Sequence, residues 1–273
     1  MKRFMRVHSM SYASFATLAL VLFAAPAWAA EQSAEELAKA SQNPIANMIS
    51  LPFQNNTNFN VGPENGVQNV LNIQPVIPIS LGTNWNLITR TILPVISQPP
   101  FGPGQNTQFG LGDTFFSAFL SPARPGEFFW GLGPLVQFPT HTDDRLGSTL
   151  WGLGPTAVAL RIDGPWLYGA LANNVWSLGG NDQEQYNNFL LQPFVNYNFG
   201  KTGTFLTSAP IVTANWRTGD WVVPLGGGLG QIFKIFGKQA VSATLQAYYN
   251  VVHPQDLGPE WQIRFSLAFL FPK

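Results

Sequence analysis

Apolar and polar residues alternate with a period of two along most of the chain from residue 53 onward. The pattern is clearest near the end, where large apolar side chains alternate with polar or small ones over 261–271. The same alternation runs through 53–61, 68–80, 185–199 and 238–251. A period of two is typical of β-strands with one apolar face. Because no helices are predicted that could cover so many apolar faces, we expect these faces to meet lipid and the polar faces to line a lumen.

Turn-forming residues divide this part of the chain into segments of strand length. We expect strands at 53–62, 68–80, 84–97, 107–121, 127–139, 148–162, 165–178, 185–199, 203–216, 220–233, 238–251 and 259–271. Their even number and their lengths predict an all-β fold, a transmembrane antiparallel β-barrel of about 12 strands. The longer connectors 97–106 and 140–147 are expected outside the cell, and the shorter ones, 81–83 and 200–202, in the periplasm.

Prolines fall inside many of these predicted strands. They are Pro75, Pro94, Pro134, Pro155, Pro193, Pro210 and Pro224. A proline has no N–H to donate to a ladder, and a closed barrel has no free edge where that loss is harmless. Each of these prolines is therefore predicted to mark a bulge or a local gap between strands.

The residues before the alternating region have a different character. Ser33 followed by Glu36 matches a capping box, and Asn43-Pro44 ends the helix that it starts. We expect a short periplasmic helical segment over 30–50 and the barrel over 51–273. At the start of the chain, Lys2, Arg3 and Arg6 precede an apolar core and the small-residue site Ala27-Trp28-Ala29. This order predicts a signal peptide over 1–29.

Composition supports a membrane location. Charged residues make up 10% of the chain, against about 25% in ordinary soluble domains. Loss of the three basic residues of the signal peptide takes 14 basic residues to 11 against 14 acidic ones, a net charge of −3, which argues against a nucleic-acid partner. The chain contains no cysteine, which excludes disulfides and thiolate chemistry. We expect the outer membrane of a diderm bacterium, with lipid, lipopolysaccharide and the barrel-assembly machinery as partners.

Several blocks of sequence resemble a known family. They are LPFQNNTNF (51–59), QNVLNIQPVIPISL (68–81), WNLITRTILPVISQP (85–99), GLGDTFFSAFLSP (110–122), PLGGGLGQIF (224–233), AYYNVV (247–252) and FLFPK (269–273). They are similar to a family of outer-membrane transport proteins named for the meta-cleavage pathway of phenol degradation, some of which are mislabelled neuromedin U. The resemblance runs from about Leu37 to Lys273. It implies a channel that moves aromatic or hydrophobic compounds, and it carries over no catalytic or binding residues.

The alternation also identifies candidate residues of the lumen. Seven polar residues occupy the positions of the alternation that face the lumen, namely Asn58, Gln74, Gln192, Asn196, Gln246, Gln262 and Arg264. Arg90 and Asp113 join them, because a charge facing lipid at mid-depth is costly. The neutral amides that dominate this set favour small neutral or amphipathic solutes over acidic sugars or phosphates. A competing interpretation is that Arg90, Asp113 and Arg264 form a structural ion-pair network.

The motif WGLGP occurs twice and carries glycines at alternate positions, Gly131 and Gly133, then Gly152 and Gly154. A nucleotide-binding loop is excluded, because the chain continues as extended LVQF and TAVAL and contains no GK[ST] motif. We predict instead that the four glycines form a bare patch on the lumen wall. The N-terminal segment, an inward side chain or the solute is expected to abut it, and bulky replacements are expected to narrow the bore.

Two other functions stay open at this point. The protein could be a structural or surface-interaction barrel, whose outer loops do the work. It could also be a membrane hydrolase, with His141 beside Asp143 and Asp144, or His253 near Asp256, as an acid–base group. The competing interpretation treats both histidines as solvated loop residues. We expect a channel rather than an enzyme, with no metal and no cofactor.

Overall fold

The computed structural model describes residues 33–102, 104–255 and 258–272. Its contacts divide the chain into Met1–Ala30 and Glu31–Lys273, and the following concerns the second unit alone. The predicted signal peptide, 1–29, lies outside the described residues. In the described part of the chain, no helix has the length and hydropathy that crossing a membrane requires.

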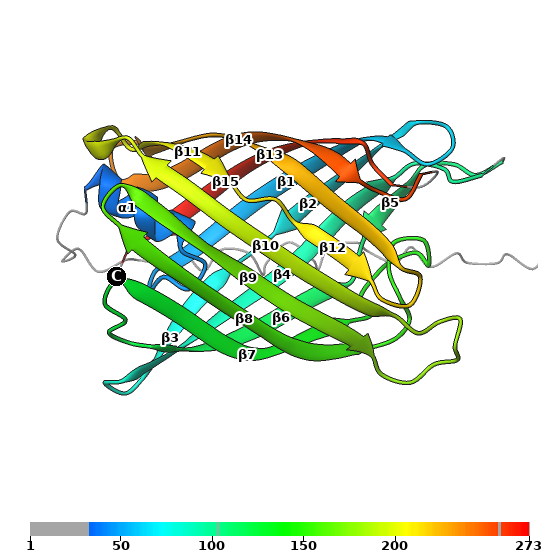
Figure 1. The fold of residues 1–273 in the computed structure, drawn as a ribbon, viewed down its shortest axis with the longest axis horizontal. Helices are drawn as coiled ribbons and strands as arrows, with labels where there is room; N and C mark the ends of the chain where they lie inside the picture. Colours follow the sequence, from blue (N-terminus) through cyan, green and yellow to red (C-terminus); the bar gives the residue numbers. More distant parts are fainter. Residues whose placement is uncertain (1–32, 103, 256–257, 273) are drawn as a thin grey trace, which may run out of the picture. The chain divides into compact units, whose positions relative to one another are not determined.

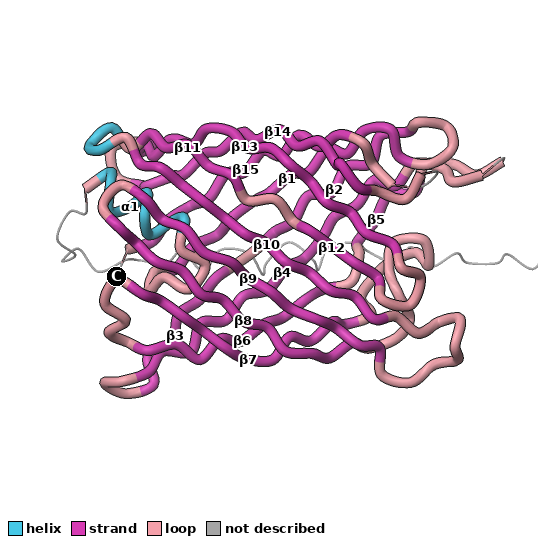
Figure 2. The backbone as a smooth tube through the Cα atoms, viewed as in Figure 1, coloured by secondary structure: helices cyan, strands magenta, loops and turns pink. Residues whose placement is uncertain are grey.

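Fifteen antiparallel strands form one closed sheet (Figures 1 and 2). They are β1 (Ile49–Val61), β2 (Gly66–Ile73), β3 (Val76–Leu81), β4 (Trp85–Gln98), β5 (Gln108–Leu111), β6 (Thr114–Pro122), β7 (Phe128–Phe138), β8 (Gly152–Asp163), β9 (Trp166–Ser177), β10 (Asn187–Asn198), β11 (Thr204–Ser208), β12 (Val212–Asn215), β13 (Asp220–Ile235), β14 (Gln239–Val252) and β15 (Trp261–Phe271). Each of the pairs β2/β3, β5/β6 and β11/β12 consists of two segments of one interrupted barrel strand. The barrel therefore has 12 strands, as predicted. The first strand, β1, pairs with the last, β15, from Ile49↔Phe271 to Phe59↔Trp261.

Each of the seven prolines named in the sequence prediction lies at an irregularity of the sheet. Pro75 and Pro210 occupy the gaps that separate β2 from β3 and β11 from β12. Pro94 lies where β4 changes its pairing from β5 to β6. Pro193 lies where β10 changes its pairing from β12 to β11.

The remaining three prolines confirm the same prediction. Pro134 and Pro155 face each other across β7 and β8, and each lies where the ladder to the strand on its other side lacks pairs. At Pro224 the register between β13 and β14 shifts. Because proline donates no ladder hydrogen bond, the barrel tolerates it by interrupting the pairing locally.

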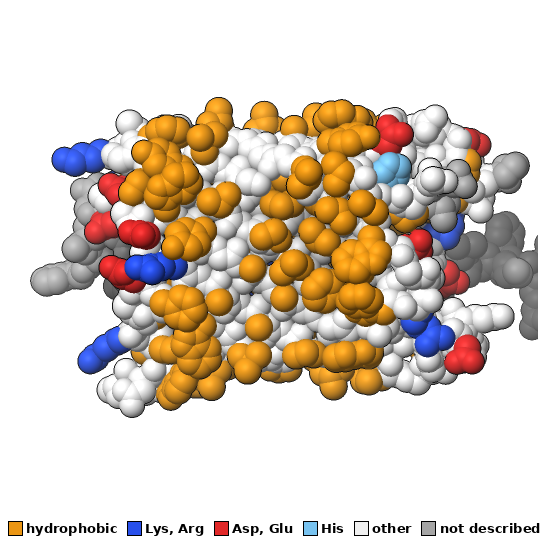
Figure 3. Space-filling view, in the orientation of Figure 1, with side chains coloured by type: hydrophobic (Ala, Val, Ile, Leu, Met, Phe, Trp, Pro, Cys, Tyr) orange, Lys and Arg blue, Asp and Glu red, His pale blue; other side chains and the backbone are white. Residues whose placement is uncertain are grey.

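The outer surface carries an apolar band with aromatic side chains near both ends (Figure 3). Aromatic pairs in contact include Trp85–Trp130 and Trp166–Tyr197 near one end, and Phe138–Trp151 and Tyr249–Trp261 near the other. Charged side chains gather at the two ends (Figure 3). Aromatic girdles on either side of an apolar band are typical of a barrel that spans a membrane.

A short helix, α1 (Ala34–Gln42), occupies one mouth of the barrel. The predicted capping box is present, because Ser33 and Glu36 bond each other's backbone N–H, and the helix ends at Asn43 as expected. Leu37, Ala38 and Met48 pack against Phe205, Ile232, Ala240 and Leu270 from the inner wall. We call residues 33–48 the inner segment and the two ends of the barrel the helix end and the loop end.

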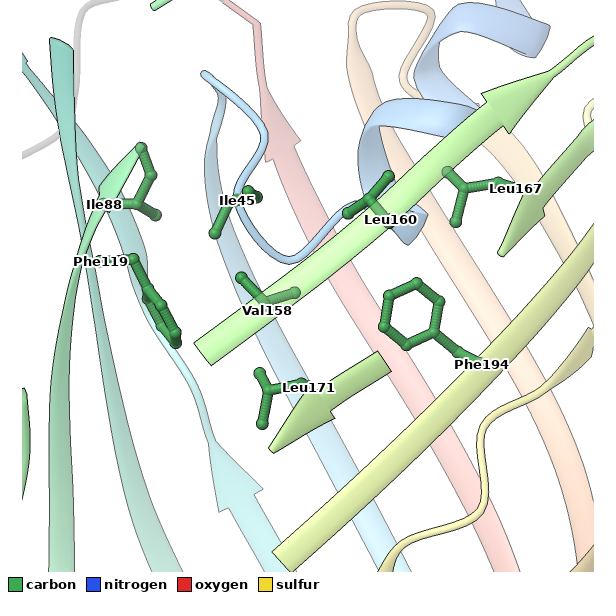
Figure 4. Packing of buried hydrophobic residues seen from close by; sticks show 8 residues of the cluster. All are labelled: Ile45, Ile88, Phe119, Val158, Leu160, Leu167, Leu171 and Phe194. Atoms are coloured by element: carbon green, nitrogen blue, oxygen red, sulfur yellow. The ribbon is translucent and has the colours of Figure 1, made fainter. Parts of the chain in front are cut away.

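The inner segment continues into the lumen beyond α1. Ile45, 4% exposed, belongs to an apolar cluster with Ile88, Phe119, Val158, Leu160, Leu167, Leu171 and Phe194 from five strands (Figure 4). The expectation of a mainly polar inner face is therefore wrong at this level of the barrel. In β8, the small Ala157 and Ala159 face outward while Val158 and Leu160 face inward, because the inner segment offers them an apolar partner.

Candidate solute path in the barrel lumen

A cavity of about 210 Å³ lies between the inner segment and the barrel wall. Five predicted lumen residues line it: Gln74, Gln192, Asn196 and Gln246, which the alternation turned inward, and Arg90, which was turned inward because of its charge. They come from β4, β10, β14 and the gap between β2 and β3. The strand pattern was sufficient to turn these side chains inward, since a period of two fixes the face of every residue in a paired strand.

Three other predicted residues face the lumen in a hydrogen-bonded row beside this cavity. Gln262 Nε2 donates to Asn58 Oδ1 at 2.8 Å, and Arg264 Nη2 donates to Gln262 Oε1 at 3.0 Å. Arg264 Nε also donates to Asn56 Oδ1 at 2.9 Å, and its guanidinium carbon lies 4.8 Å from the centre of the Tyr248 ring. The guanidinium group of Arg264 is thus engaged by protein groups on every side.

Arg264 and Tyr248 complete the wall at the gap between β11 and β12. Ala209, at the start of this gap, donates its N–H to Tyr248 Oη at 3.0 Å. Its carbonyl oxygen accepts a hydrogen bond from Arg264 Nη1 at 2.7 Å. Two inward side chains therefore satisfy backbone groups that have lost their strand partner.

An apolar groove of about 620 Å³ lies outside this gap. It is lined by Trp166, Val195, Tyr197, Phe199, Leu206, Thr207, Ser208, Gly227 and Gly228. Thr207 also lines the inner cavity, so the groove and the cavity lie against the same thin section of wall.

Asp113 lies nearer the loop end, where it lines a second cavity of about 500 Å³. Its carboxylate accepts hydrogen bonds from His141 Nδ1 at 2.7 Å, Gln137 Nε2 at 2.9 Å and the Ser148 N–H at 2.7 Å. Among the described residues, neither Arg90 nor Arg264 has a carboxylate oxygen within 4.0 Å, so the expected Arg–Asp–Arg network is wrong. Asp113 holds the long loop instead.

The loop between β7 and β8, residues 139–151, is longer than predicted because it folds inward onto Asp113. The side chain of His141 is only 9% exposed, which contradicts its interpretation as a solvated loop residue. Tyr186 lies beside this loop and donates to the Leu150 carbonyl oxygen at 3.2 Å. Burial, together with the negative charge of Asp113, raises the pKa of Tyr186 to about 12, so it remains a neutral donor at physiological pH.

We predict that Asp113→Ala releases this loop. The substitution leaves Gln137 and the Ser148 N–H without their acceptor, which costs about 2 kcal/mol or more. Trypsin should then cut after Arg145, in the same loop, faster than in the wild-type barrel embedded in lipid vesicles. Asp182→Ala, which removes a fully exposed carboxylate from another loop, is the control and should leave this rate unchanged. An unchanged rate in the Asp113 variant contradicts the anchoring role.

The four glycines of the WGLGP repeats face inward but form no common bare patch. In the observed register, Gly133 lies opposite Thr156 and Gly154 lies opposite Leu135, so larger side chains alternate with the glycines. A Cβ at Gly131 would meet Ile45 of the inner segment at 3.5 Å, as the prediction of an abutting N-terminal segment requires. A Cβ at Gly152 would meet the Tyr186 hydroxyl at 2.5 Å.

At Gly133 and Gly154 the close neighbour is backbone rather than lumen. A Cβ would collide with the carbonyl oxygen of Ala118 at the first position and with that of Asn174 at the second. Both lie next to the prolines where the ladder is interrupted, so adjacent strands approach unusually closely there. The expectation that bulky residues at these two positions narrow the bore is therefore wrong, because they would first separate the strands.

We expect Gly133→Ala and Gly154→Ala to destabilise the barrel by about 1–3 kcal/mol each, since backbone cannot move aside as a side chain can. Gly131→Ala is the matched control and should be less destabilising. Its added Cβ would meet a side-chain atom, Phe119 Cβ at 3.2 Å, rather than backbone. Urea unfolding in lipid vesicles, followed by tryptophan fluorescence, measures the difference. Equal stability of all three variants contradicts the close backbone approach.

The geometry around the histidines bears on the hydrolase alternative. His141 Nδ1 contacts a carboxylate, as in a catalytic triad, but its Nε2 faces Asp144 Oδ1 at 3.8 Å, on the side where a nucleophile is needed. His253 Nδ1 lies 3.1 Å from the Pro254 carbonyl oxygen. Within the described ranges, no group of three or more His, Asp or Glu side chains is placed to hold a metal ion.

The sequence offered the N-terminal segment as one candidate neighbour of the lumen glycines, but it did not show which residues of that segment line the cavity. Ala40, Ser41, Gln42, Asn43, Pro44, Ala46 and Met48 line the inner cavity together with the barrel wall. Gln42 Nε2 donates to Asn198 Oδ1 at 2.8 Å, and Ser41 Oγ lies 3.5 Å from Ser242 Oγ. The capping box predicted the helix, but no local signal places a helix inside a barrel.

Solved structures similar to this chain are outer-membrane β-barrels. An outer membrane channel from Pseudomonas putida F1 matches with a TM-score of 0.60 and 16% identity, over 82% of this chain and 94% of that chain. The outer membrane phospholipase dimer of Salmonella typhi matches with a TM-score of 0.45 and 15% identity, over 90% of this chain and 99% of its own. The sequence matches no protein-family profile and no curated protein. At these identities the likeness shows the fold alone, which is that of an outer-membrane β-barrel.

Proposed function

We propose that the protein is an outer-membrane channel that passively admits small hydrophobic or aromatic solutes. The observation that carries this proposal is the incompletely filled lumen, which contains a cavity of about 500 Å³ toward the loop end and one of about 210 Å³ beside the inner segment. A barrel built only as a scaffold has no need of such space. The amide-lined walls offer hydrogen bonds without a fixed charge pattern, and the apolar cluster around Phe119 and Phe194 suits aromatic solutes.

The orientation follows from the lengths of the connectors. Short turns such as 82–84, 164–165 and 236–238 lie at the helix end, and long connectors such as 139–151 and 178–186 lie at the loop end. In outer-membrane barrels the short turns face the periplasm. We therefore assign the inner segment to the periplasmic mouth and the Asp113 cavity to the extracellular mouth. Lipid and lipopolysaccharide around the barrel, and the assembly machinery that inserts it, remain its proposed partners.

The solute class in this proposal comes from the resemblance of the sequence blocks to the phenol-degradation transport family, although no family profile matches the chain. The similarity to an outer membrane channel supports the barrel architecture that such transport needs. The proposal assigns no catalytic step to the protein, because no hydroxyl group of the described residues is hydrogen-bonded to His141 Nε2.

Planar-bilayer recording combined with solute uptake into liposomes tests the proposal. Purified protein should give discrete conductance steps and should admit small test solutes, and the variant His141→Gln should conduct like the wild type. A barrel that gives neither conductance nor uptake contradicts the channel. If extracellular loop deletions alter a surface interaction while the sealed barrel transports nothing, the structural alternative is favoured. Lipid hydrolysis that is lost in His141→Gln favours the hydrolase.

A further inference from the structure

The two arginines of the lumen differ in how their charges are satisfied. The guanidinium group of Arg264 bonds Asn56, Gln262 and the Ala209 carbonyl oxygen, and it stacks on Tyr248. Arg90 donates one hydrogen bond among the described residues, from Nη2 to Gln74 Oε1 at 2.6 Å. A guanidinium group has five N–H donors, so Arg90 keeps most of its donor capacity unused by protein groups.

Arg90 also has no charged neighbour among the described residues of the cavity wall. It is the one charged side chain among the described residues that line the inner cavity, and none of the lining residues is acidic. A cation held in a narrow lumen without a counterion attracts an anion, and the low polarizability of the surrounding wall strengthens that attraction. Gln74 holds the guanidinium group in position from one side and cannot neutralise it.

The rest of the cavity indicates what kind of anion would fit. Leu171, Phe194 and Val76 line it together with Arg90, so the cavity combines an apolar surface with the charge. A dry cavity of about 150 Å³ suffices for benzene. The observed cavity of about 210 Å³ leaves room for one ring and a small polar group. Planar guanidinium geometry favours a carboxylate, whose two oxygens can accept a pair of parallel hydrogen bonds.

We propose that Arg90 is an anion-binding residue of the channel and receives the carboxylate of a single-ring aromatic acid, with the ring against Phe194 and Leu171. This inference rests on the proposed channel function and adds a solute class to it. It refines the sequence-based expectation of neutral or amphipathic solutes, because an aromatic carboxylate is amphipathic and charged. The neutral amides around the cavity then solvate the anion without competing for Arg90.

Calorimetric titration of the detergent-solubilised full-length barrel with benzoate and with benzamide, its neutral counterpart, tests the site. The wild type should bind benzoate at least about tenfold more tightly than benzamide, a difference of roughly 1.4 kcal/mol. Arg90→Gln should remove this preference, because it weakens the binding of benzoate more than that of benzamide. Arg161→Gln removes an equal charge from an exposed pair with Glu127 and should keep the preference.

A second variant covers the case in which Arg90→Gln fails to fold. Arg90→Lys keeps the charge but not the paired donors, so it should bind benzoate less tightly than the wild type and still prefer it to benzamide. Equal affinity of the wild type for the two compounds, or a preference that survives in Arg90→Gln, overturns the proposal. Conductance of the same preparations in planar bilayers distinguishes failure of the anion site from failure of the proposed channel function. A conducting barrel without benzoate preference rejects the anion site alone, and a silent barrel rejects the channel.

Discussion

Deleting residues 34–46 is expected to raise the conductance of the barrel several-fold. These residues occupy the lumen at the helix end through α1 and the apolar contacts of Ile45, and they leave a cavity of only about 210 Å³ beside them. A barrel of 12 strands is wide enough to hold an aqueous path once its interior is cleared. Single-channel recording in planar bilayers measures the change directly.

A deletion that damages the barrel would also raise its conductance. The same increase must therefore be seen in a full-length variant. Ile45→Asp places a carboxylate in the apolar cluster and should unseat the inner segment, which raises conductance in the same direction. Adding Ser41→Cys and Ser242→Cys provides the control, because the two hydroxyl oxygens lie 3.5 Å apart and the chain has no other cysteine. Oxidation should return the Ile45 variant to wild-type conductance, and reduction should reverse this. A deletion variant that conducts like the wild type refutes the plugging role.

Replacing Arg264 by methionine is expected to destabilise the barrel by about 3 kcal/mol or more, because three acceptors lose a charged donor in a buried setting. The side chain of methionine fills a similar volume but donates no hydrogen bond. The loss affects the Ala209 carbonyl oxygen most, because this group lies in the gap between β11 and β12 and has no strand partner. Urea unfolding of the reconstituted barrel measures the effect.

Arg161→Met is the matched control for this change. Arg161 forms an exposed pair with Glu127 at 3.2 Å, and such pairs contribute about 0–1 kcal/mol. Arg264→Lys should fall between the two, because one ammonium group cannot reach Asn56, Gln262 and the Ala209 carbonyl oxygen together. Similar stability of the Arg264 and Arg161 methionine variants is incompatible with a structural role of Arg264 at the gap.

The polar lumen residues show how far local pattern reaches. Gln74, Gln192, Asn196 and Gln246 were placed correctly because strand pairing makes every second residue share a face. The charged residues were also turned inward correctly, but their partners were not found. Asp113 bonds a loop residue, His141, and a loop has no periodicity from which such a contact can be read.

The glycines of the two WGLGP motifs mark a different limit. Their spacing predicted that the glycines of each motif share a face, and the prolines beside them predicted irregular ladders correctly. Whether a glycine faces open lumen or a neighbouring backbone depends on the distance between strands. That distance at Gly133 and Gly154 results from the local loss of pairing and is not encoded in the alternation of residue types.

By itself, the sequence determined the number of strands, the faces of the polar lumen residues, the helix cap at Ser33 and the irregularities at the prolines. These features depend on residue type and near-neighbour spacing, which the chain displays directly. Only the tertiary structure decided that the inner segment enters the lumen, that Ile45 turns several apolar side chains inward, and that Arg264 is satisfied while Arg90 is not. Those features depend on contacts between residues far apart in the chain, where burial and hydrogen bonding are settled by the closed barrel as a whole.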